Sequence, residues 1–134
     1  MSTPPYLDLP TGARRLDVPV ARGSRAAIAL DPDAAVRGTA VLIPGFTGSK
    51  EDFIALLEPL AVRGWRAVAY DQLGQWDSPG PDDDAAYALA RLGEDARDIA
   101  DAVGPGPVHV VGHSLGGLVA RSAVIDAGPC GWLR

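Results

Sequence analysis

Short continuous apolar runs alternate along this chain with stretches that have a helical period. The run at residues 108–111 is typical of a strand buried on both faces of a sheet, and Gly38–Ile43 is apolar throughout, as expected of a central strand. Trp65–Tyr70 is predicted to be the strand that follows it along the chain. Between these last two segments, the apolar positions share one face of a helix: Phe53, Leu56, Leu57, Leu60 and Ala61. A strand, a helix and a second strand in this order form a crossover, so the pattern predicts a parallel sheet with a right-handed connection.

The predicted helices carry local signals at their ends. Ser49 and Asp52 have the spacing of a capping box, and Arg63 followed by Gly64 is a typical helix C-terminus. A second helix is predicted over residues 85–103, with a break near Gly93. Its apolar stripe is expected to face the core and consists of Leu92, Ala96, Ile99 and Val103.

The first part of the chain adds two strands, over Arg14–Val20 and residues 24–31, that we expect to form a hairpin. Residues 1–12 are rich in proline and polar residues and are expected to form a loose arm. Residues 132–134 resemble the beginning of another strand. We therefore predict one incomplete domain over residues 1–134, with the arm and hairpin in residues 1–37 and a parallel α/β core in residues 38–134. The fold class is an α/β three-layer sandwich of about five strands, mostly parallel, with the run at residues 108–111 at one edge.

The residues after that last run have the pattern of a nucleophile elbow. Gly112-His113-Ser114-Leu115-Gly116 is a G-x-S-x-G, and an almost wholly apolar helix is predicted over residues 118–127. A nucleophilic serine lies on a strained turn that projects beyond the end of its sheet. Gly112 and Gly116 have no side chains, so the strand before the turn and the helix after it do not collide. Because the helix start presents free N–H groups, Ser114 is the candidate nucleophile and the Leu115 N–H a candidate oxyanion donor.

Three segments together resemble the alpha/beta-hydrolase superfamily. They read Gly112-His113-Ser114-Leu115-Gly116-Gly117, Leu42-Ile43-Pro44-Gly45-Phe46 and Asp71-Gln72-Leu73-Gly74-Gln75. The resemblance covers residues 39–126 and implies a partial alpha/beta-hydrolase fold with a serine that attacks an ester, amide or similar acyl bond of a small molecule. It also implies that the Phe46 N–H is the second oxyanion donor.

The resemblance bears on Asp71 as well. The family pattern Asp-x-Arg-Gly-x-Gly-x-Ser keeps Asp71, Gly74 and Ser78 here, whereas Leu73 replaces the arginine and Trp76 the second glycine. Asp71 follows a strand, so it can be a catalytic acid or a carboxylate that orders its loop. The family places its acid after a later strand, which favours the loop-ordering role.

A serine nucleophile needs a base and an acid that orients it. In the family both follow the serine in sequence, but only Asp126 and no histidine follows Ser114 here. His109 and His113 are expected to be structural. The chain thus reads as the nucleophile half of a truncated hydrolase. The alternatives are an inactive fragment or interaction module, or a non-hydrolytic member of the fold such as an acyltransferase or a cofactor-free haloperoxidase-like enzyme.

Composition and charge limit the classes of molecule that this chain is expected to bind. The chain has 12 basic and 17 acidic residues and a net charge of −5, which argues against nucleic acid or an anionic membrane surface as partner. No apolar run is long enough to cross a membrane, and residues 1–10 lack the features of a signal peptide. The single Cys130 cannot form an internal disulfide, so we expect a cytoplasmic protein. No cofactor and no metal is expected, while the unpaired sheet edge predicts self-association.

Overall fold

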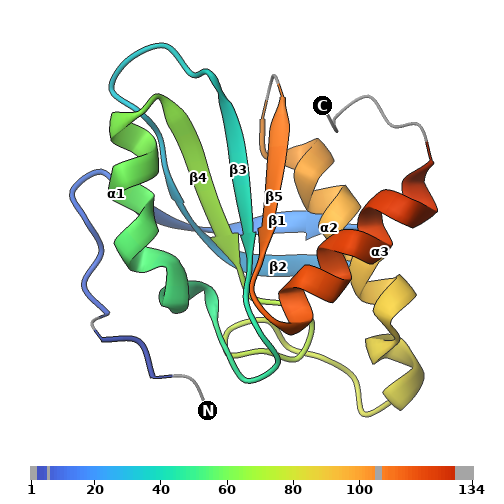
Figure 1. Cartoon of the computed structure of the whole chain (residues 1–134). Coiled ribbons are helices and arrows are strands. Elements are labelled where there is room, and N and C mark those ends of the chain that lie inside the picture. Colours follow the sequence, from blue (N-terminus) through green and yellow to red (C-terminus); the bar gives the residue numbers. More distant parts are fainter. Residues whose placement is uncertain (1–2, 6, 105–106, 129–134) are drawn as a thin grey trace.

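The computed structural model describes residues 3–5, 7–104 and 107–128. Its centre is one mixed sheet in the order β1-β2-β4-β3-β5 (Figure 1). The strands are β1 (Arg14–Val20), β2 (Gly23–Leu30), β3 (Gly38–Ile43), β4 (Trp65–Tyr70) and β5 (Val108–Gly112). The predicted α/β sandwich and the edge position of the last strand are confirmed.

The sheet has an antiparallel part and a parallel part. β1 pairs with β2, and β2 with β4, in antiparallel register, so the predicted hairpin is present. β4, β3 and β5 are parallel, with Val41 of β3 opposite both Val68 and Val110. The carboxyl ends of β3, β4 and β5 therefore lie on the same side of the molecule, which is where active sites of α/β proteins lie.

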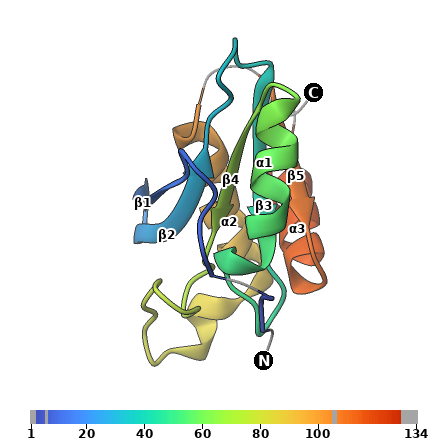
Figure 2. The same cartoon turned by 90° about the vertical axis from the view of Figure 1, so that its left-hand side faces the viewer.

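Helices cover both faces of the sheet. A 3-10 turn, η1 (Lys50–Phe53), leads into α1 (Ile54–Val62) on one face (Figure 2). A second 3-10 turn, η2 (Asp84–Tyr87), precedes α2 (Leu89–Ala102), and α2 lies beside α3 (Leu115–Ala127) on the other face (Figure 1).

Each central strand sends alternate side chains into two hydrophobic layers, as the two-residue period of a strand requires. In β3, Val41 and Ile43 pack on the α2 and α3 side, whereas Ala40 and Leu42 pack on the α1 side. All four are at least 97% buried. The continuous apolar run that predicted this strand is thus explained by burial on both faces.

Two details of the predicted helices were wrong. The helix does not break at Gly93, which lies inside α2; the interruption is at Ala88, whose ψ of 140° separates η2 from α2. Gly93 instead allows close packing, since a Cβ there would lie 3.0 Å from Ser122 Oγ of α3. In the first helix, Leu56 is 45% exposed, while Ile54 is buried in its place. The last predicted strand, at residues 132–134, and Cys130 lie outside the described residues.

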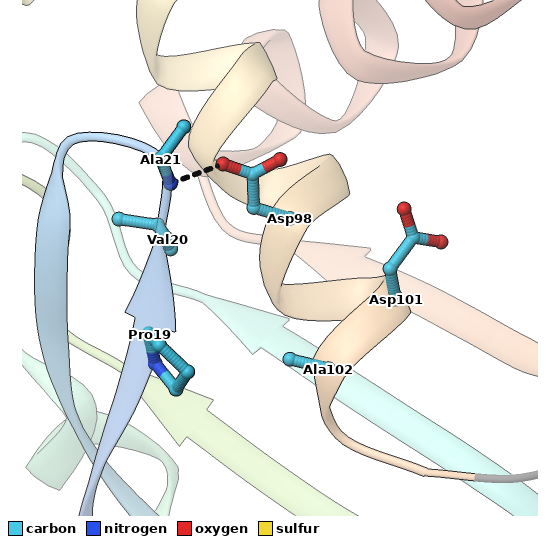
Figure 3. Close-up of a pocket in the computed structure, with 6 residues that line it drawn as sticks. All are labelled: Pro19, Val20, Ala21, Asp98, Asp101 and Ala102. Carbon is cyan, nitrogen blue, oxygen red and sulfur yellow. Dashed lines mark hydrogen bonds between the residues drawn. The ribbon is translucent and has the colours of Figure 1, made fainter.

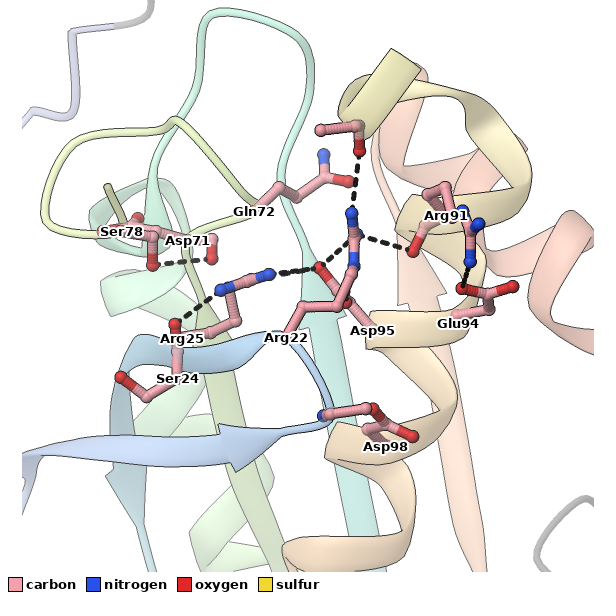
Figure 4. Close-up of polar contacts among 12 residues, drawn as sticks. Arg22, Ser24, Arg25, Asp71, Gln72, Ser78, Arg91, Glu94, Asp95 and Asp98 are labelled. Carbon is pink, nitrogen blue, oxygen red and sulfur yellow. Dashed lines mark hydrogen bonds and ion pairs between the residues drawn. The ribbon is translucent and has the colours of Figure 1, made fainter. Parts of the chain in front are cut away.

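Buried ion pairs attach the hairpin to α2 (Figure 4). Arg25 is 2% exposed and donates two hydrogen bonds to Asp95 Oδ2, at 2.6 and 3.1 Å. Arg22 also binds Asp95 and donates to the carbonyl groups of Ala86 and Arg91. Because Asp95 faces two guanidinium groups, α2 is fixed against the start of β2.

Nearby, Asp98 of α2 accepts the Ala21 N–H at 2.8 Å, beside a shallow depression of about 480 Å³ (Figure 3). Pro19, Val20, Asp101 and Ala102 complete its walls, and it contains no elbow residue.

Candidate active site

Ser114 lies on a strained turn between β5 and α3. Its φ of 52° and ψ of −117° are unusual for a residue with a side chain. Among the described non-glycine residues, Trp76 alone shares its positive φ. Such a conformation costs on the order of 1–3 kcal/mol and persists only where the surroundings enforce it. Ser114 is an exposed residue, and the turn places it at the carboxyl end of β5.

Two glycines let the limbs of this turn approach each other. A Cβ on Gly112 would lie closer than 3.0 Å to the backbone of Gly116 and Gly117. A Cβ on Gly116 would lie 2.7 Å from the carbonyl oxygen of Pro44 and 2.8 Å from the carbonyl carbon of Ile43. Side chains are therefore excluded at both positions by backbone that cannot move aside.

The loop after β3 lies directly against the elbow. The His113 N–H donates to the Ile43 carbonyl at 3.0 Å. A Cβ on Gly45 would lie 3.1 Å from His113 Nδ1 and 3.4 Å from Ser114 Cβ. The two loops that follow the neighbouring strands β3 and β5 are thus in contact at the position of Ser114.

The two proposed oxyanion donors have free N–H groups. Neither the Phe46 nor the Leu115 N–H donates a hydrogen bond to another described residue. Both residues line one pocket of about 340 Å³, together with Gln72, Leu73, Gly74, Gln75, Tyr87, Leu89 and Leu92. Its lining is mainly apolar and carries no charged side chain, which suits an uncharged group of a ligand.

No base reaches Ser114 within the part of the chain that the structure describes. The Ser114 hydroxyl has no hydrogen-bond partner there. His109 packs edge-on against Trp65, with ring centroids 4.6 Å apart. Asp126 accepts a hydrogen bond from Ser122 at 2.9 Å, and it lies twelve residues along α3 from Ser114, about 18 Å at the helical rise.

Asp71 orders its loop through Lys50. Its carboxylate accepts hydrogen bonds from the Lys50 backbone N–H and ammonium, both at 2.7 Å, and from the Asp77 N–H at 3.1 Å. Lys50 is 1% exposed and also binds Glu51 and the Asp77 carboxylate. Burial alone would lower the pKa of Lys50, but its hydrogen bonds to Asp71 and Asp77 raise it. This agrees with the loop-ordering role, and Lys50 is a buried cation that the sequence did not reveal.

Two glutamines of this same loop bridge to the loop after β3, and sequence reasoning missed both. Gln72 Nε2 donates to the Pro44 carbonyl at 2.9 Å. Gln75 Nε2 donates to the carbonyl groups of Gly45 and Phe46, at 2.7 and 3.1 Å. These contacts join residues about thirty positions apart in sequence, so no local pattern signals them.

The described residues also lack two kinds of feature, a metal-binding cluster and a membrane-spanning helix. No cluster of three or more His, Cys, Asp or Glu side chains is arranged to hold a metal ion. In the same residues, no helix has the length and apolar character needed to cross a membrane.

Known proteins are similar to this chain in sequence and in fold. The family model described as alpha/beta hydrolase fold matches residues 40–129. A putative carbamate hydrolase, RutD, of Variovorax paradoxus is 41% identical over 90 residues, which cover 66% of this chain and 34% of the relative. A proline iminopeptidase of Lactobacillus delbrueckii subsp. lactis is 30% identical over 102 residues, covering 74% of this chain and 35% of the relative.

Among solved structures, an epoxide hydrolase from an endophytic Streptomyces superposes with a TM-score of 0.77 at 27% identity, covering 88% of this chain and 35% of that one. The chain thus spans about a third of the length of the relatives it matches. The matched residues include most of the parallel strands β3, β4 and β5, both candidate donors and the elbow, and the chain belongs to the alpha/beta hydrolase family.

Proposed function

We propose that this chain carries the nucleophile and oxyanion site of a serine hydrolase that acts on an uncharged acyl compound. The Ser114 oxygen attacks the acyl carbon, and the electron pair of the carbonyl moves onto its oxygen. The Leu115 and Phe46 N–H groups stabilise that negative charge. Collapse of the intermediate expels the alcohol or amine, which takes up a proton, and water then releases the acid from Ser114.

The backbone of Ser114 is the observation that carries this proposal. A serine with φ of 52°, at the first turn of a helix and between glycines in contact with backbone, is far more constrained than a serine in an ordinary turn needs to be. Relatives named as a carbamate hydrolase and a proline iminopeptidase support hydrolysis as the reaction class. The apolar lining next to Phe46 and Leu115 supports an uncharged acyl group as the part of the substrate held there.

The base is the missing part. The Ser114 proton must pass to an acceptor during attack, and no described residue accepts a hydrogen bond from the hydroxyl. Without a base, a serine hydroxyl is a weak nucleophile at neutral pH. We therefore propose that these 134 residues are inactive alone and become active when a segment supplies the histidine and its acid.

Hydrolysis of p-nitrophenyl acetate tests this proposal. The 134-residue chain is compared with a version joined to the part of the Variovorax relative that lies beyond the matched segment. Each version is paired with its Ser114→Ala variant. We expect release of p-nitrophenol above the Ser114→Ala background only from the joined protein. A joined protein that is folded but no faster than its Ser114→Ala variant would refute Ser114 as the nucleophile.

The free edge of β5 supports a second, independent proposal, self-association. In the described part of the chain no strand pairs with the outer side of β5, and Val111 on it is 46% exposed. Leu118 and Ile125 of the adjacent α3 are 51% and 62% exposed. An open edge beside exposed apolar groups favours pairing with another copy. Analytical ultracentrifugation of the chain at increasing concentration tests this, and a monomer at every concentration would contradict it.

A further inference from the structure

The Phe46 N–H belongs to the peptide unit whose other end is the Gly45 carbonyl. A trans peptide is planar, so its C=O and N–H point in opposite directions and turn together. Whatever holds the Gly45 carbonyl therefore fixes the direction of the Phe46 N–H. The direction of this donor is the least constrained part of the proposed site, because it lies on a loop with glycine at both positions 45 and 48.

Gln75 holds that carbonyl. Its Nε2 donates to the Gly45 oxygen at 2.7 Å, and the Gly48 N–H donates to the same oxygen at 3.1 Å. The same Nε2 reaches the Phe46 carbonyl at 3.1 Å, so the peptide units on both sides of Phe46 are bound by one amide group. Gln72 extends this arrangement by binding the preceding carbonyl, that of Pro44, at 2.9 Å.

The glutamine is itself fixed, and its amide orientation follows from its partners. The Gln75 Oε1 accepts the Gln72 N–H at 3.1 Å, which leaves Nε2 facing the carbonyl groups. The Gln75 N–H donates to the Gln72 carbonyl at 2.9 Å, and its carbonyl accepts the Ser78 N–H at 2.7 Å. The loop of the glutamines is anchored in turn, because Ser78 Oγ accepts the Ala26 N–H of β2 and donates to the Asp71 carbonyl.

We propose that Gln75, supported by Gln72, is the positioning residue that sets the Gly45–Phe46 peptide plane and thereby aims the Phe46 N–H at the developing oxyanion. We call the hydrogen bonds from the Gln75 amide to the Gly45 and Phe46 carbonyl groups the clamp. That the Phe46 N–H serves an oxyanion rests on the proposed function, whereas the clamp does not depend on it. Gln75 does not touch the substrate in this role. It acts by preventing rotation of a peptide unit that glycine at position 45 would otherwise allow.

The clamp is tested without any chemistry, by NMR spectroscopy of the 134-residue chain. Gln75→Met keeps the length of the side chain and removes the donor, and Gln75 is only half-buried, so the fold should survive. We expect the Gly45 carbonyl ¹³C signal to move and the Phe46 amide signal to broaden or split. Trp76→Ala changes the adjacent, 73% exposed residue and serves as the matched control. Unchanged Gly45 and Phe46 signals in Gln75→Met would overturn the clamp.

Binding of phenylboronic acid then tests whether Gln75 directs the Phe46 N–H toward an oxyanion. The serine oxygen bonds to boron, a proton is released to solvent, and the tetrahedral anion resembles the intermediate. Binding to the wild-type chain that is lost in Ser114→Ala supports the site. Gln75→Met should then bind about two- to tenfold more weakly, as expected when the hydrogen bond from the Phe46 N–H is lost. Gln75→Asn, a shorter amide, should recover less than the full affinity.

The two failures are distinguishable. Equal affinity of wild type and Gln75→Met would overturn the positioning role. No Ser114-dependent binding to the wild-type chain would count against the proposed function, while the NMR comparison would still decide whether Gln75 holds the peptide plane.

Discussion

Gly116 and Gly117 are adjacent in the first turn of α3, yet alanine should have opposite effects on stability at the two positions. At Gly117 the nearest atom to an added Cβ is the Gly112 carbonyl oxygen at 3.5 Å, an ordinary contact. Gly117→Ala should therefore stabilise the fold by up to about 1 kcal/mol, because alanine favours helix.

At Gly116 the same methyl group collides with the backbone of β3 and of the following loop. It would lie 2.7 Å from the Pro44 oxygen and 2.8 Å from the Ile43 carbonyl carbon, and still closer to the Ile43 oxygen. Relief requires α3 to move away from the central strand by more than half an ångström, and overpacking of this kind costs about 1–3 kcal/mol or more. We expect Gly116→Ala to lower the free energy of unfolding by about 2 kcal/mol after the gain in helix propensity.

Urea denaturation followed by circular dichroism measures both variants against wild type. In a thermal denaturation of the same variants, a loss of about 2 kcal/mol should lower the melting temperature by roughly 6–8 °C in a chain of this size. The expected order of stability is Gly117→Ala, wild type, Gly116→Ala. If Gly116→Ala is as stable as Gly117→Ala, the elbow does not approach β3 as closely as the account requires.

Three further predictions concern buried polar groups. Lys50→Met should lower the free energy of unfolding by about 3–5 kcal/mol, because the buried carboxyl group of Asp71 loses its cationic partner. Since the pKa of Lys50 is raised above 10.5, the stabilisation from its ion pairs is fully present below pH 10.5 and is lost as the pH rises through the folded-state pKa. The urea midpoint should therefore fall more steeply with pH above 10.5 for wild type than for Lys50→Met. Tyr70→Phe should be neutral or stabilising, by up to about 1 kcal/mol in the same assay, because the buried hydroxyl has no partner among the described residues; a clear loss would reveal a missed contact. Asp95→Ala should cost about 3–5 kcal/mol by leaving Arg25 unpaired, and a loss below 1 kcal/mol would contradict the importance of this pair.

The fold was predictable where a local pattern decided it. The run over Gly38–Ile43 reveals a central strand because burial on both faces leaves no polar position. The interruption of the second helix was misplaced because glycine weakens a helix by propensity, whereas Gly93 is kept by close contact with α3. That contact depends on how two helices pack and is not present in the sequence of either one.

The candidate site was predictable to the same extent. Ser114 and its glycines are contiguous, so one motif places them together. The polar groups that fix the surrounding loops come from distant segments: Lys50 meets Asp71, and Gln75 meets Gly45, only after the parallel strands have brought their carboxyl ends together. Charged and amide residues are usually exposed, so composition gives no reason to expect them in the interior.

Labelling with a fluorophosphonate probe shows directly whether Ser114 is a nucleophile and whether these residues contain its base. The Ser114 oxygen attacks phosphorus, fluoride leaves, and the serine proton passes to a base, so the reaction reports a nucleophile together with its base. We expect no labelling of the 134-residue chain, and stoichiometric labelling at Ser114, located by mass spectrometry, in the protein joined to the part of the Variovorax relative that lies beyond the matched segment. Labelling of the short chain that is lost in Ser114→Ala would contradict the account, because a base would then exist within these residues; a folded joined protein that stays unlabelled would contradict it equally.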